Sequence, residues 1–203
     1  MSWSLSLAAP PETDLLDAFF LATGKALYLA NAYERKCQYV LRVGNLVTAH
    51  QADPSLALEE IIAAAPADKL LGGTLHGLAA HTMGQAMDMS VLHKAREARN
   101  FIAHEGAAVG YVWSASKDQI LRQASKLRVA VRDLSHGDNL ISQWCHGLDE
   151  PHGPQPVDWI RTYPKTVETW VFGSLNELIP TEDAEPNADP RSPGSFGARK
   201  QPE

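Results

Sequence analysis

The feature that most constrains the fold is the scarcity of helix-breaking residues over most of the chain. Between Leu15 and Cys145 there are only two prolines, Pro54 and Pro66. No part of this stretch shows sustained alternation of apolar and polar residues, apart from the short AVGYVW run after Gly106. Because proline interrupts helices and strands show a period of two, this pattern predicts an all-α protein. The simplest such architecture is an up-down bundle of four or five helices.

Local signals predict where the first helices begin and end. A long first helix is expected over residues 12–49, which are rich in leucine, alanine and aromatic residues. Asp53 fits an N-cap and Pro54 a first helical position, so a second helix is expected from there to about residue 65. The glycines at positions 72, 73 and 77 predict a break after it.

Two capping boxes predict the next helices. The pairs Thr82/Gln85 and Ser116/Gln119 have the spacing of an N-cap residue and the third helical residue. Gly106 fits a helix C-terminus. The expected segments are therefore a helix over residues 83–105, a helix over 116–134, a turn or kink at 135–138 and a last helical piece over 139–145.

Composition divides the chain near residue 150. Three prolines, Pro151, Pro154 and Pro156, fall within six residues there. We expect a helical bundle over residues 1–150 and a docked C-terminal extension over 151–180, built of one or two short helices broken before Pro164. The polar, Pro/Gly-rich residues 181–203 are expected to form a disordered tail, because they cannot bury enough apolar surface to offset chain entropy.

Charge and cysteine content exclude several classes of protein. The net charge of −6 argues against a protein that coats nucleic acid non-specifically. Two cysteines cannot form a disulfide framework, and no basic segment precedes an apolar run at the N-terminus, so we expect a cytoplasmic protein. The longest uncharged run, Leu70 to Met87, holds glycine, histidine and threonine residues and makes a poor membrane span.

The helix expected over residues 83–105 carries the most information. At about 100° per residue, one arc of this helix is apolar and forms the expected core stripe. A row of two histidines, an arginine and an asparagine lies on the opposite side at spacings of 3, 4 and 4. A solvated helix face more often carries Glu and Lys, although a polar row opposite the core is what any surface helix shows. The stripe is Met87, Val91, Ala95, Ala98 and Ile102, and the row is His93, Arg96, Asn100 and His104.

The end of this helix resembles the signature of a known family. Arg99-Asn-Phe-Ile-Ala-His104 has the form R-N-x-x-x-H, in a small all-α chain and at a helix end. It is similar to the R-x4–6-H signature of the HEPN superfamily, with Asn100 at the polar position that commonly follows the arginine. The resemblance covers about residues 12–147.

The resemblance implies a metal-independent endoribonuclease that acts as a homodimer, with both motifs at the interface. Arg99 and His104 match the signature positions and would be catalytic together with Asn100; the neighbouring Arg96 and His93 are candidate substrate-binding residues. An imidazole can act as base or acid near neutral pH, and a guanidinium offers a fixed fork of donors to phosphate oxygens. The expected product carries a 2′,3′-cyclic phosphate, and no cofactor or metal is required.

The resemblance also implies partners: an RNA substrate and, for a toxin or defence effector, an antitoxin of nucleotidyltransferase type. One family feature is missing, because the tyrosine that some toxins carry two residues after the histidine is replaced by Gly106.

The geometry of a helix places a condition on this motif. Residues five apart on a straight helix point about 140° apart. Arg99 and His104 would therefore meet only if the helix loosens before Gly106, the arginine curls round, or a second copy supplies the partner group.

Other groups of charged residues and histidines are explained by helix surfaces without a functional role. Glu34 fits a surface pair with Gln38, although it could instead orient His104. The basic residues Arg122, Lys126, Arg128 and Arg132 could follow an RNA backbone, but a solvated helix face is the simpler interpretation. Histidines near Cys145 match no zinc spacing, so no metal site is predicted. The alternative to a nuclease is a catalytically inactive HEPN-like module that dimerises or docks another protein.

Overall fold

The computed structural model describes residues 12–55, 57–64, 70–80 and 86–179, and within these ranges it consists of helices without strands. The all-α prediction is confirmed. The expected capping box at Thr82/Gln85 and the expected disordered tail over residues 181–203 lie outside the described residues. The α-helices are α1 (Thr13–Ala52), α2 (Leu58–Ala64), α3 (Leu71–Ala80), α4 (Ala86–His104), α5 (Lys117–Asp149) and α6 (Val157–Leu178), with a 3₁₀ turn at Val112–Ser114.

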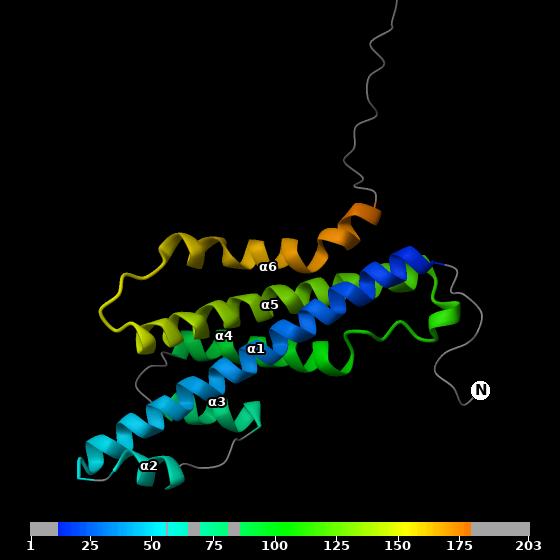
Figure 1. Ribbon diagram of the computed structural model, residues 1–203. Coiled ribbons are helices and arrows are strands. Elements are labelled where there is room, and N and C mark those ends of the chain that lie inside the picture. Colours follow the sequence, from blue (N-terminus) through cyan, green and yellow to red (C-terminus); the bar gives the residue numbers. More distant parts are fainter. Residues whose placement is uncertain (1–11, 56, 65–69, 81–85, 180–203) are drawn as a thin grey trace, which may run out of the picture.

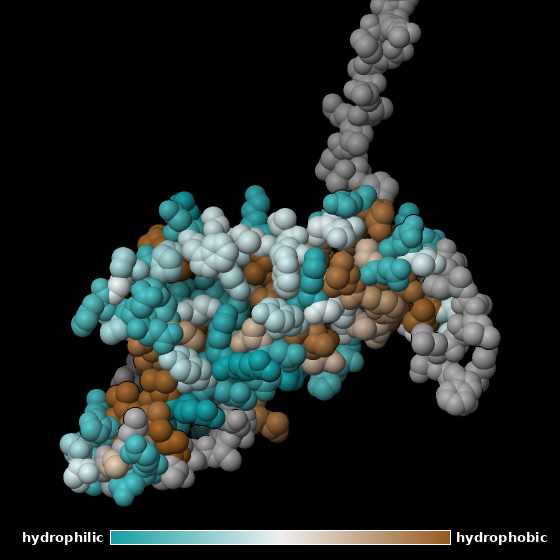
Figure 2. Space-filling model, viewed as in Figure 1, coloured by the Kyte–Doolittle hydropathy of each residue, from teal (hydrophilic) through white to brown (hydrophobic). Residues whose placement is uncertain are grey.

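The four longest helices, α1, α4, α5 and α6, form the body of the protein (Figure 1). The 40-residue α1 is about 60 Å long at 1.5 Å per residue. Its buried residues end at Val40, and its remaining turns extend past the body to meet α2 and α3. Figure 2 shows hydrophobic surface at that end, where Val47 and Ile62 are about half exposed.

The core lies where α1, α4 and α5 cross, and α6 packs along α1 and α5. Tyr33 is fully buried there, and its hydroxyl donates a hydrogen bond to the Leu92 carbonyl over 2.8 Å. This bond satisfies the one polar group of a large buried side chain. The largest fully buried side chains are Tyr33, Phe19, Phe172, Leu16, Leu75, Leu78, Leu92, Ile120, Leu127, Leu134, Ile141 and Leu175.

The turn or kink expected at residues 135–138 does not interrupt the helix, because α5 continues from Lys117 to Asp149. Gly137 is buried, and a Cβ there would overlap the Cβ of Ala95 on α4. Asp138 is fully buried and holds Lys36 of α1, while Ser135 donates its hydroxyl hydrogen bond back to the Arg132 carbonyl. Residues typical of a turn are used here for helix packing.

The predicted break before Pro164 is also wrong, because α6 is continuous from Val157 to Leu178. A proline inside a helix leaves the carbonyl four residues earlier without its N–H partner. That carbonyl belongs to Ile160, and the Asn139 side-chain amide of α5 donates to it over 2.8 Å. A tertiary hydrogen bond therefore replaces the missing helical one.

The predicted break at the glycines of residues 72–77 is wrong for the same kind of reason. Residues 71–80 form α3, and its glycines lie close to neighbouring helices. A Cβ on Gly77 would lie 2.8 Å from Leu41 Cδ1, and one on Gly72 would lie 3.2 Å from an Arg96 terminal nitrogen. The missing side chains let α3 approach α1 and α4.

Other predicted boundaries had mixed outcomes. The capping box of Ser116 and Gln119 is confirmed at the start of α5. Asp53 is the C-cap of α1, not the N-cap of α2; its carboxylate accepts hydrogen bonds from the Ser55 backbone N–H and hydroxyl, which holds a turn between the two helices. The AVGYVW run forms no strand, and its last two residues enter the 3₁₀ turn.

The core stripe predicted for α4 is partly correct. Ala95, Ala98 and Ile102 are buried. Met87 is 79% exposed, because it lies in the first turn of the helix, at the edge of the body. Met89 and Leu92 are buried residues of α4 that the predicted stripe missed.

We predict that Gly137→Ala lowers the free energy of unfolding by about 2 kcal/mol, because the added methyl group overpacks the contact with Ala95. Gly24→Ala is the matched control: Gly24 lies within α1 with nothing within 4 Å of its Cβ position, so the substitution should stabilise by up to about 1 kcal/mol. Urea unfolding followed by circular dichroism measures both. Equal shifts of the two midpoints would contradict the close approach of α4 and α5.

Candidate functional site

Arg99 is held by a residue from a different helix. Its Nη2 donates to Glu34 Oε2 of α1 over 2.5 Å, and its Nη1 donates to Asn100 Oδ1 over 3.2 Å. The two charged side chains are 22% and 18% exposed, so the ion pair is only partly screened by water. Glu34 thus pairs with Arg99, and neither Gln38 nor His104 is its partner. The guanidinium is turned toward α1.

His104 is exposed and is the last residue of α4. Because the helix is α-helical up to this residue, it does not loosen between Arg99 and His104. No hydrogen bond or ion pair joins His104 to Arg99 or Asn100 among the described contacts. The structure therefore brings Arg99 and Asn100 together and leaves the imidazole separate from Arg99, which points to another side of the same helix.

The remaining members of the predicted polar row also lie in different surroundings. His93 is exposed, as expected of a residue opposite the core. Arg96 is half-buried beside Gly72 of α3, and its Nε is fully buried with no hydrogen-bond partner among the described residues. The face that periodicity presents as one solvated row is therefore partly covered by α3.

A buried polar cluster that sequence reasoning missed joins α1, α5 and α6. Asp138 is fully buried and accepts hydrogen bonds from Lys36 Nζ at 2.9 and 3.0 Å and from the Tyr163 hydroxyl. The same ammonium donates to Ser142 Oγ over 2.9 Å. The available signal was that Leu134, Asp138 and Ile141 share one stripe once residues 117–149 form one continuous helix.

Burial raises the pKa values of several groups around this cluster. It raises the pKa of the Cys37 thiol to about 12 and that of Cys145 to about 11, and nearby Asp138 adds to both shifts. Burial and then the Asp138 carboxylate raise the pKa of Tyr163 well above its usual range. Both thiols are therefore protonated near neutral pH, and the buried Cys37 is an unreactive thiol.

Two pockets lie along α4 and α5. The larger, of about 560 Å³, has Ala98, Phe101, Val129 and Ala130 among its lining residues. Its charged lining residues are Lys94, Glu97, Lys126 and Asp133. The smaller, of about 250 Å³, is lined by Ala108, Val109 and Gly110 after α4 and by Gln119, Arg122, Gln123 and Lys126 of α5. Lys126 belongs to both, so the pockets are neighbours.

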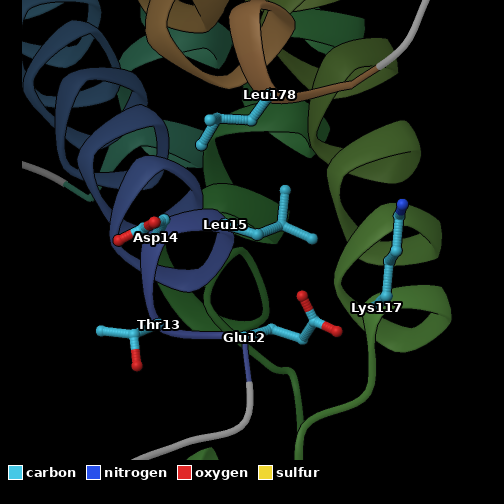
Figure 3. Close-up of a pocket in the computed structure, with 6 residues that line it drawn as sticks. All are labelled: Glu12, Thr13, Asp14, Leu15, Lys117 and Leu178. Atoms are coloured by element: carbon cyan, nitrogen blue, oxygen red, sulfur yellow. The ribbon is translucent and has the colours of Figure 1, made fainter.

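A third pocket, of about 380 Å³, lies where α1 and α5 begin and α6 ends. Figure 3 shows Leu15 and Glu12 turned toward the space in front of α5, whereas Thr13 and Asp14 point away from it. None of the residues singled out in the sequence lines this pocket.

Within the described ranges, no three His, Cys, Asp or Glu side chains gather in an arrangement that suits a metal ion. No helix of the described part of the chain has the length and apolar character needed to cross a membrane.

We predict that Lys36→Met lowers the free energy of unfolding by about 3 kcal/mol, because it leaves the fully buried Asp138 carboxylate without its cation. Arg35→Met, at the exposed neighbouring position, should change it by less than about 0.5 kcal/mol. Denaturant titration of both variants tests the difference. An equal, small effect would show that Asp138 does not depend on Lys36.

Comparison of the chain with family models, with curated proteins and with solved structures gives no match. The candidate site is therefore interpreted from its own geometry and from the motif in α4.

Proposed function

We propose that this protein is an endoribonuclease of HEPN type that cleaves RNA through attack of a ribose 2′-hydroxyl. The observation that carries the proposal is the position of the R-N-x-x-x-H motif: it occupies the last turns of one continuous helix and ends on an exposed histidine. An exposed imidazole at a helix end can reach a bound polymer, as a catalytic base must.

The proposed reaction needs no group beyond side chains and RNA. The His104 imidazole takes the proton of the 2′-hydroxyl, the 2′-oxygen forms a bond to phosphorus, and the bond from phosphorus to the 5′-oxygen breaks. The leaving oxygen takes a proton from a second acid, which in a dimer is His104 of the other copy after it has been protonated. The products are a 2′,3′-cyclic phosphate and a 5′-hydroxyl end.

In this proposal Arg99 binds phosphate oxygens and Asn100 orients the reacting groups. A phosphate that enters the site competes with Glu34 for the Arg99 guanidinium, since a fixed fork of donors suits either anion. His93 is exposed on the same helix and is a candidate contact for neighbouring nucleotides. The substrate-binding role of the half-buried Arg96 stays a prediction.

We further propose that the protein acts as a homodimer through the larger pocket between α4 and α5. The charged residues of this pocket are two cations and two anions, which makes the surface complementary to its own copy across a two-fold axis. Phe101, which lines it, lies three residues before His104 and therefore on the same side of α4. A second copy seated there brings two His104 side chains toward one interface.

A catalytically inactive helical module is the alternative, and the ion pair of Arg99 with Glu34 favours it. A guanidinium already paired within its own chain, at 2.5 Å and mostly shielded from water, is a stabilising contact between α1 and α4. In that case the motif serves packing, and the pocket between α4 and α5 serves association alone. A nucleotidyltransferase antitoxin belongs to the nuclease proposal only.

We predict that the purified protein cleaves single-stranded RNA in the presence of EDTA, and that His104→Ala and Arg99→Ala each lower the rate at least 100-fold. His76→Ala, at an exposed histidine of α3, is the matched control and should keep the wild-type rate. Replacing the ribose at the cleaved position by deoxyribose should abolish cleavage there. Intact RNA with the wild-type protein would leave the inactive module as the function.

We predict that Val129→Asp converts the dimer to a monomer, because it places a charge among the apolar residues of the interface. Val129 is 51% exposed, so the substitution leaves the core of the monomer intact. Val47→Asp is the control, at a valine of α1 that is 48% exposed and lies outside this pocket. Light scattering coupled to size exclusion measures the mass of each. A wild-type monomer, or a dimer that only Val47→Asp disrupts, would refute this interface.

A further inference from the structure

The smaller pocket, at the start of α5, is lined by a cationic set of side chains. Its α5 residues are Gln119, Arg122, Gln123 and Lys126, and its other wall is the chain at Ala108–Gly110. None of these residues is acidic, in a chain whose net charge is −6. Two cations at one small pocket of an acidic protein mark a local site for an anion.

The walls of this pocket are fixed by hydrogen bonds. Gln123 Nε2 donates to the Glu105 carbonyl over 2.6 Å, and so joins α5 to the residue that follows α4. The side chain of Gln119 accepts from the Ser116 backbone N–H over 2.9 Å as part of the capping box. Gly110 has a φ of 77°, which favours glycine and lets the chain turn beside the pocket. The pocket is thus pre-formed.

The two cations of the pocket differ in their contacts from Arg128, the next arginine along α5, whose partners lie on α6. Arg128 is bound to Glu168 over 2.7 Å and to Asn176 over 2.6 Å, and its guanidinium lies 4.4 Å from the centre of the Phe172 ring. It serves the contact with α6. Arg122 and Lys126 are exposed, and no ion pair engages either of them among the described residues. The basic row of the sequence is therefore divided between one packing residue, Arg128, and three residues that face solvent, of which Arg122 and Lys126 line this pocket.

An exposed aromatic ring follows the pocket in the chain. Tyr111, the residue after Gly110, is 68% exposed and stacks on the half-buried Trp113 with the ring centres 4.9 Å apart. The stack holds one ring face fixed in front of solvent. Proteins that bind single-stranded nucleic acid combine such rings, which stack on bases, with a cationic groove for the backbone.

The pocket also lies next to the proposed catalytic histidine in the chain. His104 ends α4, Glu105 follows and is held by Gln123, and Ala108–Gly110 form the pocket wall. Arg99 is turned toward α1 by Glu34, so the motif alone supplies little positive charge beside His104. RNA that reaches His104 carries a phosphate at every nucleotide, and Arg122 and Lys126 are placed to neutralise one of them.

We propose that this pocket binds a phosphodiester of single-stranded RNA through Arg122 and Lys126, while Tyr111 stacks on an adjacent base. The inference rests on the proposed nuclease function and deepens it, because it assigns the substrate contacts outside the motif. It also explains how an acidic protein retains RNA: the contact is confined to a few residues. Free inorganic phosphate presents the same charged oxygens as a phosphodiester of RNA, so it is the competing occupant of the pocket.

The experiment measures binding separately from cleavage. The full chain is titrated into a fluorescent single-stranded oligonucleotide of 2′-O-methyl ribose, which carries the phosphates and bases but cannot undergo attack by a 2′-hydroxyl. Fluorescence anisotropy at several salt concentrations gives the dissociation constant and its salt dependence. Arg122→Gln/Lys126→Gln removes both pocket cations, and Lys117→Gln/Arg132→Gln removes two other exposed cations of α5 as the matched control. Because Lys126 also lines the proposed interface between copies, Arg122→Gln alone is measured as well, and it should weaken binding without touching that interface.

We expect the pocket double variant to weaken binding at least tenfold. It should also reduce the slope of log affinity against log salt by about 0.7, because one phosphate contact on a single strand contributes about 0.7. Tyr111→Ala should weaken binding about tenfold without changing this slope, because stacking is not a charge interaction. Tyr28→Ala, at a tyrosine of α1 that is 67% exposed, is its control and should bind as the wild type does.

Each outcome has a distinct meaning. Equal effects of the pocket and control double variants, or no binding by the wild type, would overturn the inference, even if RNA is cleaved. Pocket-dependent binding without cleavage of ordinary RNA would retain the RNA site and reject the nuclease. Displacement of the oligonucleotide by millimolar inorganic phosphate, with no effect of Tyr111→Ala, would identify a site for a free anion and reject the RNA contact.

Discussion

The fold depends on the contact at which α4 and α5 approach each other through the bare backbone of Gly137. The Cβ of Ala95 occupies the space that a side chain at position 137 would need, and the Tyr33 ring of α1 closes the same point. Close packing of three helices excludes water from the hydroxyl of Tyr33, which is why it must bond the Leu92 carbonyl. Asp138, one residue further on, is buried as a consequence and requires the Lys36 ammonium.

The all-α class was predicted correctly from the sequence, but the breaks expected within the helices are not present. Gly137, Gly77 and Pro164 all carry local signals for a turn or a break, and all three lie inside helices. Local propensity is a weak effect, of about 1 kcal/mol for a glycine, and tertiary contacts exceed it. Each contact involves a residue distant in the chain, Ala95, Leu41 or Asn139, so a reading of neighbouring residues could not find it.

The candidate site divides in the same way between local and distant information. The motif positions, the helix that holds them and the exposure of His104 follow from spacing along one helix. The partner of Arg99 does not, because Glu34 is 65 residues away. Nor does periodicity show that α3 covers Arg96, or that Arg128 turns to α6 while Arg122 and Lys126 stay together. Charge patterns along a helix show which side chains are polar, and the neighbouring helices decide their partners.

The hydrogen bond from Asn139 to the Ile160 carbonyl has a consequence for how the last helix moves. Helices that pack through apolar ridges alone can slide past each other in small steps at modest cost. Here a shift of α6 by one residue would separate the Asn139 amide from the Ile160 carbonyl, which Pro164 leaves without its helical partner, within a half-buried interface. This hydrogen bond therefore fixes the register of α6 against α5. We expect α6 to separate from the body as a whole segment, in one cooperative step, without sliding along α5.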